Sequence, residues 1–93
     1  MSKKLGYEIS LEIVRRALER AGESSPVASH TRIGDILTEP SERELLREMI
    51  RDEVKLAGFG IKRDAIPVDP YLTIERITAA VSTLAGDPGT DDD

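Results

Sequence analysis

The stretch Ser41–Gly58, SERELLREMIRDEVKLAG, decides the fold of this 93-residue chain. Ser41 and Glu44 have the spacing of a capping box, in which each side chain accepts a hydrogen bond from the other residue's backbone N–H. Gly58 can take the left-handed conformation that ends a helix. The stretch therefore predicts a helix of about 16 residues, whose apolar stripe consists of Leu45, Leu46, Met49, Ile50, Val54 and Ala57.

A second helix is predicted over Leu11–Ala21. Ser10 before it is a suitable N-cap residue, and Gly22 after it is a suitable stop. Its apolar positions recur at steps of three and four, while the charged residues between them face water. The inward stripe consists of Leu11, Val14, Ala17, Leu18 and Ala21.

The third helix is expected to open at Asp69-Pro70 and to end at Gly86. A carboxylate can cap the N-terminus, and proline fits the first helical position because that residue needs no N–H donor. The apolar residues again follow at helical spacing, and they are Tyr71, Ile74, Ile77, Val81 and Leu84.

The connections between these helices are expected to be partly ordered. Gly22–Pro40 is too long for a structureless link in a compact domain, so we expect one helical turn within Thr31–Leu37. A short helix is also expected near Arg63–Ile66. The prediction is an all-α fold, a small bundle of three main helices plus one or two short helices, in one domain over residues 1–86. Residues 87–93 are expected to form a disordered acidic tail.

Composition excludes several kinds of chemistry. The chain has no cysteine and a single histidine, His30, so neither a thiolate nucleophile nor a clustered metal site is expected. Glu44, Glu48 and Asp52 follow one helical face beside an arginine stripe, which predicts an ion-paired solvent face rather than an acid–base pair. No enzyme is predicted. Because no apolar run reaches the length of about 20 residues that spans a bilayer, we expect a cytoplasmic protein.

Three short stretches, with the order of the elements, resemble the acyl and peptidyl carrier protein family. Thr31-Arg-Ile-Gly-Asp-Ile-Leu37 is similar to the loop before the family's Asp-Ser-Leu attachment motif. Phe59-Gly-Ile61 through Ile66-Pro67, and then Leu72-Thr-Ile74, are similar to the segment between the family's second and last helices. The resemblance covers residues 9–86 and implies a carrier-protein-like topology.

The resemblance also implies an attachment serine for a phosphopantetheine arm. When the apolar positions are matched without a gap, that serine falls on Pro40, which has no hydroxyl. A slide of one residue makes Ser41 the candidate, at a helix N-terminus whose dipole favours a phosphate. Pro40 and Glu42 differ from the family's Asp and Leu. The capping box accounts for Ser41 without any cofactor.

Three functions remain open from the sequence. The first is a non-catalytic module that docks to a protein partner as an adaptor or regulatory subunit, without an arm or other cofactor. Its expected docking residues lie on the long charged helix, and they are Glu42, Arg43, Arg47, Glu48 and Arg51. The second is a working carrier with phosphopantetheine on Ser41. The oligomeric state stays open in both.

The third is a small DNA-associated regulator. Arg43, Arg47, Arg51 and Lys55 form a stripe at four-residue steps, followed by Lys62 and Arg63. The net charge of −5 disfavours nucleic acid, although the tail at 87–93 holds four of the negative charges and residues 1–86 carry only −1. Acidic side chains on the same helix would also face the phosphates.

Overall fold

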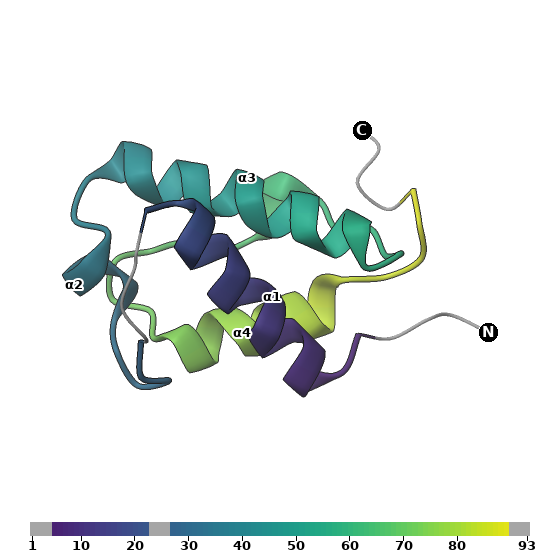
Figure 1. The fold of residues 1–93 in the computed structure, drawn as a ribbon, viewed down its shortest axis with the longest axis horizontal. Coiled ribbons are helices and arrows are strands. Elements are labelled where there is room, and N and C mark those ends of the chain that lie inside the picture. Colours follow the sequence, from purple (N-terminus) through teal and green to yellow (C-terminus); the bar gives the residue numbers. More distant parts are fainter. Residues whose placement is uncertain (1–4, 23–26, 90–93) are drawn as a thin grey trace.

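The computed structural model describes residues 5–22 and 27–89. Within these ranges the chain forms only helices and loops, apart from two isolated β-bridges, which confirms the predicted all-α fold. The main helices α1 and α3 lie side by side, and α1 also packs on α4 (Figure 1). The elements in chain order are α1 (Tyr7–Arg20), α2 (Ile33–Ile36), α3 (Pro40–Leu56), the 3-10 helix η1 (Arg63–Ala65) and α4 (Ile74–Leu84).

Helix α1 begins four residues before its predicted start, so the expected N-cap role of Ser10 is wrong. Ser10 is buried within the helix, and its hydroxyl donates to the Gly6 carbonyl oxygen at 2.8 Å. The reason is tertiary: Leu5 is buried, and its carbonyl oxygen accepts a hydrogen bond from Ser82 Oγ of α4 at 2.7 Å. The predicted stop at Gly22 is confirmed by its φ of +110°.

Helix α3 lies where it was predicted, but its capping box lies two residues earlier. The Glu39 N–H donates to Glu42 Oε1 at 3.0 Å, and Pro40 occupies the first helical position. The box therefore uses Glu39 and Glu42 instead of Ser41 and Glu44. Proline at this position explains the shift, because its fixed φ already suits the first turn.

The end of α3 is a Schellman motif, as Gly58 predicted. Gly58 has a φ of +88°, and its N–H donates to the Lys55 carbonyl oxygen at 3.0 Å. The Phe59 N–H donates to the Val54 carbonyl oxygen at 3.1 Å. These two bonds satisfy carbonyl groups that the last helical turn leaves without a partner.

Helix α4 begins at Ile74, so the predicted cap at Asp69-Pro70 is wrong. Thr73 is the N-cap, and its Oγ1 accepts a hydrogen bond from the Arg76 N–H at 3.2 Å. The N–H groups of the first two helical residues bond to a loop that is distant in sequence. The Ile74 N–H donates to the Thr31 carbonyl oxygen at 3.0 Å, and the Glu75 N–H donates to the Ser29 carbonyl oxygen at 2.8 Å. The loop before α2 therefore caps α4.

The short elements confirm the predicted order within the connections. Helix α2 falls inside Thr31–Leu37, and η1 falls inside Arg63–Ile66. Gly86 follows α4 but takes part in a β-bridge with Gly60, with N···O distances of 3.0 and 2.9 Å. Residues 87–89 of the predicted tail are exposed, and residues 90–93 lie outside the described residues.

The core is aliphatic and joins α1, α2, α3 and α4, whereas η1 contributes no buried residue. Leu45, Tyr71 and Leu84, which the periodicity placed inside, are instead 43 %, 69 % and 38 % exposed, and Ala57 of the predicted stripe is exposed too. The predicted stripes otherwise supply much of the interior, together with residues of the loops. The main buried side chains are Leu5, Ile13, Val14, Leu18, Ile33, Leu46, Ile50, Val54, Ile61, Ile66, Ile74, Ile77 and Val81.

Candidate functional site

Ser41 lies exposed in the first turn of α3. Because Glu39 and Glu42 form the capping box, the helix does not need Ser41 as its cap. The positive end of the helix dipole would favour a phosphate on this hydroxyl. Two carboxylates of the capping box, close by in the same turn, would oppose it. The position thus fits an attached arm sterically, while its charges are mixed.

Two of the predicted docking residues tie α3 to its neighbouring loops. Arg43 Nη1 donates to the carbonyl oxygens of Leu37 at 2.8 Å and of Thr38 at 3.1 Å. Arg47 Nε donates to the carbonyl oxygen of Ile66 at 3.0 Å. Both arginines are only partly exposed. Their first role in the fold is to satisfy loop carbonyl groups.

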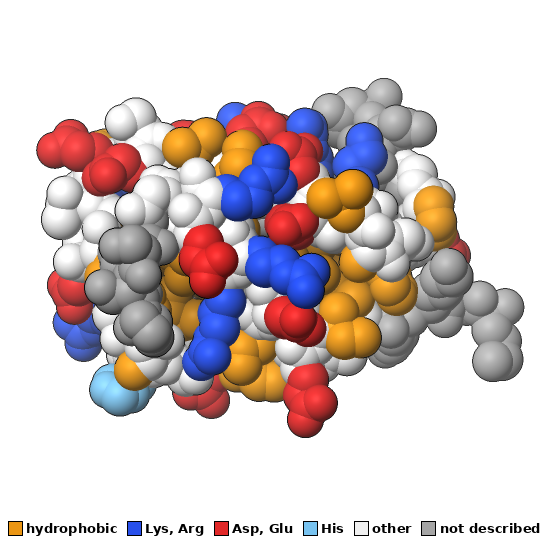
Figure 2. Space-filling view, viewed as in Figure 1, with side chains coloured by type: hydrophobic (Ala, Val, Ile, Leu, Met, Phe, Trp, Pro, Cys, Tyr) orange, Lys and Arg blue, Asp and Glu red, His pale blue; other side chains and the backbone are white. Residues whose placement is uncertain are grey.

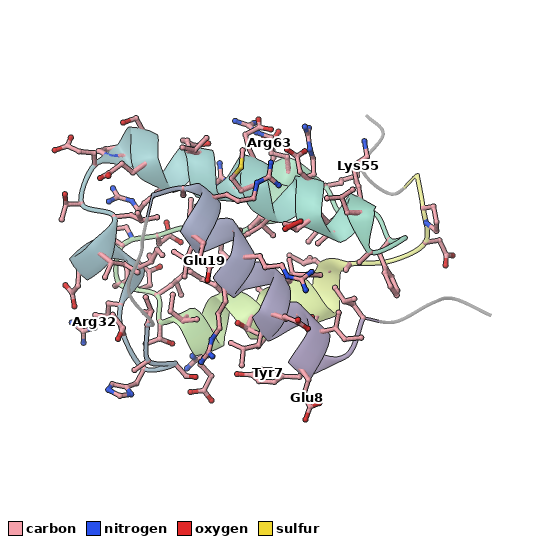
Figure 3. The ribbon with its side chains drawn as sticks, in the orientation of Figure 1. Tyr7, Glu8, Glu19, Arg32, Lys55 and Arg63 are labelled. Atoms are coloured by element: carbon pink, nitrogen blue, oxygen red, sulfur yellow. The ribbon has the colours of Figure 1, made fainter. Side chains whose placement is uncertain are left out.

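A chain of ion pairs connects α3 with η1. Arg47 Nη1 lies 2.9 Å from Glu44 Oε1, and Arg51 Nη2 lies 3.1 Å from Glu48 Oε2. Arg63 of η1 joins the two pairs, because it contacts Glu44 at 3.3 Å and also contacts Glu48. Figure 3 shows Arg63 along the same edge of the molecule as Lys55 of α3. The predicted ion-paired face is confirmed, and Arg63 is an addition that helical spacing alone could not show.

This network weakens the DNA alternative. Arg47, Arg51 and Arg63 each lie within 4 Å of a carboxylate oxygen. A DNA phosphate would have to compete with Glu44 and Glu48 for the same guanidinium groups.

The outward side of α3 carries a strip of four residues at steps of four, three and four, which places them in one line. We call Ser41, Leu45, Glu48 and Asp52 the outer strip. Leu45 is 43 % exposed between Ser41 and Glu48 of the strip, whereas its spacing had predicted burial. An exposed leucine within charged residues is an arrangement suited to docking.

A second surface lies between α1 and the C-terminal part of α3. A cavity of about 150 Å³ opens there, and we call it the α1–α3 groove. Ile9 and Leu56, which line it, are 51 % and 78 % exposed. Figure 2 shows apolar side chains gathered on this face among acidic and basic ones. The full lining is Ile9, Glu12, Ile13, Arg16, Glu53, Leu56 and Ala57.

The sequence did not indicate this groove. Ile9 and Leu56 belong to separate helices, and neither lay on a predicted inward stripe. Only the packing of α1 against α3 brings them together. The one signal in the sequence is that Leu56 is a large apolar residue outside the stripe of its helix.

Other kinds of site find no support in residues 5–22 and 27–89. His30 is exposed in a loop, and the His, Asp and Glu residues of these ranges form no group that could hold a metal ion. Among the described helices, none combines the length and the apolar character needed to cross a bilayer.

Comparison of the chain with protein-family models, with curated proteins and with solved structures finds no significant match in any of the three. The resemblance to carrier proteins therefore remains a prediction from residues and element order.

Proposed function

We propose that this chain is a non-catalytic, carrier-protein-like helical module that docks to a protein partner through the outer strip of α3. It would act as an adaptor or regulatory subunit without a prosthetic arm. The cytoplasmic location expected from the sequence is part of the same proposal.

One observation carries this proposal: Leu45 is 43 % exposed on the outward side of the longest described helix, within a line of polar and acidic residues. Isolated exposed leucines are ordinary on protein surfaces. This one lies one turn before Glu48 and two turns before Asp52 on the same line of α3, so a partner that covers the strip would bury Leu45 and meet both carboxylates. An apolar centre with a charged rim is the usual anatomy of a docking surface.

The charge of the strip indicates the character of the partner. Glu48 and Asp52 are the charged members of the strip, and both carboxylates contact Arg51 Nη2, at 3.1 and 3.5 Å. Complementary potentials raise the association rate and select partners more than they raise affinity. A surface with an apolar centre and charged groups of both signs around it is therefore the expected counterpart, and weakening by salt is the expected behaviour.

The test uses the full chain as bait, identification of the captured protein, and titration of the purified pair. Leu45→Arg should weaken binding at least about tenfold, because it removes the apolar centre and places a charge where the partner would bury a leucine. Leu84→Arg is the matched control, since Leu84 is a similarly exposed leucine on α4. Equal affinity for the wild type and Leu45→Arg would reject docking through this strip.

A second candidate is a working carrier with phosphopantetheine on Ser41. It is favoured by one observation, the release of Ser41 from the capping role that would otherwise explain it. Ser41 would hold the arm through a phosphodiester on its hydroxyl, and the arm would supply a thiol for acyl groups. Pro40 and the carboxylates of Glu39 and Glu42 are expected to disfavour recognition of Ser41 by the transferase.

Intact mass after co-expression with a promiscuous phosphopantetheinyl transferase decides between the two candidates. The armless module predicts an unchanged mass. A mass increase equal to one phosphopantetheine, absent from Ser41→Ala, would establish the carrier. Circular dichroism of Ser41→Ala provides the control that the variant is folded.

A further inference from the structure

The short helix η1 is held against α3 by ion pairs and not by buried side chains of its own. No residue of η1 is buried, whereas Ile61 before it and Ile66 after it are fully buried and fix the two ends of the segment. Between these ends, Arg63 contacts Glu44 of α3 at 3.3 Å and also contacts Glu48. Ion pairs between partly exposed side chains contribute little stability, so the middle of the segment is held only weakly.

Both carboxylates that Arg63 contacts have a second partner on α3 itself. The two carboxylate oxygens of Glu44 accept hydrogen bonds from Arg47 Nη1, at 2.9 and 3.1 Å. Glu48 Oε2 lies 3.1 Å from Arg51 Nη2. If Arg63 moved away from α3, neither carboxylate would lose its last cationic partner. The release of Arg63 therefore has a low electrostatic cost.

The docked arrangement of η1 also has a cost of its own. The Nε atoms of Arg51 and Arg63 are buried and make no hydrogen bond with residues 5–22 or 27–89, although Arg63 Nε lies within ion-pair distance of Glu48. A buried N–H group without a well-formed hydrogen bond lowers stability. Without Arg63, Glu48 can accept from Nε and Nη2 of Arg51 together, which is the strong bidentate geometry. Arg63 would keep its own contact with Asp64, at 3.1 Å.

Glu48 connects η1 to the proposed docking surface, because this residue belongs to the outer strip. While η1 is docked, the Glu48 carboxylate is shared between the guanidinium groups of Arg51 and Arg63. We propose that η1 is a releasable latch, in which Arg63 competes with a cationic group of the partner for Glu48. The docked latch restrains binding at the outer strip, and a bound partner displaces Arg63. This inference rests on the proposed docking function and adds a mechanism of regulation to it.

The first test measures the latch in the full chain without any partner. Salt weakens exposed ion pairs, because the screening length falls from about 30 Å at 0.01 M to about 3 Å at 1 M. Arg63→Gln removes the charge that holds the latch and gives the reference spectrum of its released state. In the ¹⁵N-labelled wild type, the amide signals of residues 62–66 should move with added salt towards their positions in Arg63→Gln. The same signals should respond much less to salt in Arg63→Gln.

The matched control is Arg16→Gln, because Arg16 is another ion-paired arginine, 2.9 Å from Glu12 on α1. It makes the same change of charge away from η1. Residues 62–66 should respond to salt in Arg16→Gln as they do in the wild type. The latch is rejected if these signals ignore salt in the wild type, or if they respond equally in Arg63→Gln. It is also rejected if circular dichroism shows that Arg63→Gln is unfolded, since Arg63 would then be required for the fold.

The second test uses the partner captured with the full chain. Arg63→Gln should bind this partner at least about twofold more tightly than the wild type, because no ion pair to Glu48 has to be broken first. Arg16→Gln should bind as the wild type does. Weaker binding by Arg63→Gln would overturn the proposal, because Arg63 would then contact the partner instead of competing with it.

Leu45→Arg distinguishes this inference from the proposed function. If Leu45→Arg weakens binding and Arg63→Gln leaves the affinity unchanged, docking through the outer strip stands and the latch fails. If Leu45→Arg binds as the wild type does, the outer strip fails, and regulation by the latch fails with it. If Leu45→Arg weakens binding and Arg63→Gln strengthens it, both stand.

Discussion

The N-termini of α3 and α4 are capped by different kinds of partner. At α3 the partners are neighbours in sequence: Glu39 and Glu42 form the capping box around Pro40. At α4 only Thr73 is local, and the donors of Ile74 and Glu75 bond to backbone carbonyl groups of the loop before α2. Helix α3 is therefore capped by residues adjacent to it in sequence, whereas α4 is capped largely by a loop that the fold brings close.

This difference teaches that α4 and the long connection depend on each other. The Ile33 N–H donates to the Leu72 carbonyl oxygen at 2.7 Å, and the Gly34 N–H donates to that of Pro70 at 2.8 Å. Together with the two bonds at the start of α4, they hold the two segments in one unit. Damage to the connection should therefore reach α4, whereas damage at the N-terminus of α3 should stay local.

The largest expected effect is that of Gly34→Ala. A Cβ at this position would lie 2.6 Å from Pro70 Cβ and 2.7 Å from the Pro70 carbonyl oxygen, so backbone must move. We expect a loss of about 1 to 3 kcal/mol in the free energy of unfolding, measured by urea denaturation. Hydrogen exchange should also speed up at Ile74 and Glu75.

Gly6→Ala is the control for this prediction, because its Cβ would meet nothing within 4 Å. It should lose much less stability than Gly34→Ala. Slow exchange at the start of α4 in a destabilised Gly34→Ala would contradict the idea that the connection caps α4.

The next effect is that of Thr73→Ala. It removes the acceptor for the Arg76 N–H and should cost about 1 kcal/mol, as N-cap replacements usually do. Thr73→Ser keeps a hydroxyl and should recover most of this loss. If the alanine and serine variants melt at the same temperature, the hydrogen bond from the Arg76 N–H to Thr73 contributes no measurable stability in addition to the bonds from Ile74 and Glu75.

A smaller effect is expected at the N-terminus of α3 from Glu42→Ala. The variant removes the acceptor of the Glu39 N–H, but water can replace it at this exposed end, so the loss should be about 0.5 kcal/mol. Glu42→Gln retains an acceptor and should be close to the wild type. If Glu42→Ala lost as much stability as Gly34→Ala, damage at the N-terminus of α3 would not be local, and the difference between α3 and α4 would not hold.

The smallest effect is expected from Ser41→Ala, which should change stability by less than about 0.5 kcal/mol. Ser41 is exposed, and Glu39 with Glu42 provides the capping box. Ser41→Asp should be equally mild, because the added carboxylate is favoured by the helix dipole. A loss of about 1 kcal/mol for alanine in chemical denaturation would restore the cap to Ser41.

Where the prediction from sequence succeeded, its evidence was local. Gly58 ends α3 because a left-handed glycine satisfies carbonyl groups of its own last turn. Where it failed, the deciding contact came from elsewhere. Ser10 looked like a cap, yet it lies inside α1, since the buried Leu5 and its bond to Ser82 extend the ordered chain towards the N-terminus.

Of the candidate surfaces, one also follows from local sequence and the other depends on tertiary contacts. The ion-paired face of α3 follows from charges at steps of three and four, and its pairs at Arg47 and Arg51 agree with that spacing. Arg63 could not be assigned to it, because its place depends on how η1 packs on α3. The α1–α3 groove needs two helices in contact before it exists at all.

The sequence by itself determined the number and kind of helices and much of the residue set in the core, because 3.6-residue periodicity and backbone-specific glycine and proline act within a few residues. Tertiary structure decided where α1 and α4 begin, that Leu45 faces outwards, and that Glu53 lines a groove. The physical reason is that a hydrogen-bond donor or an apolar surface can pair with any suitable group that lies close in space. The order of residues along the chain does not show which distant group the fold brings close.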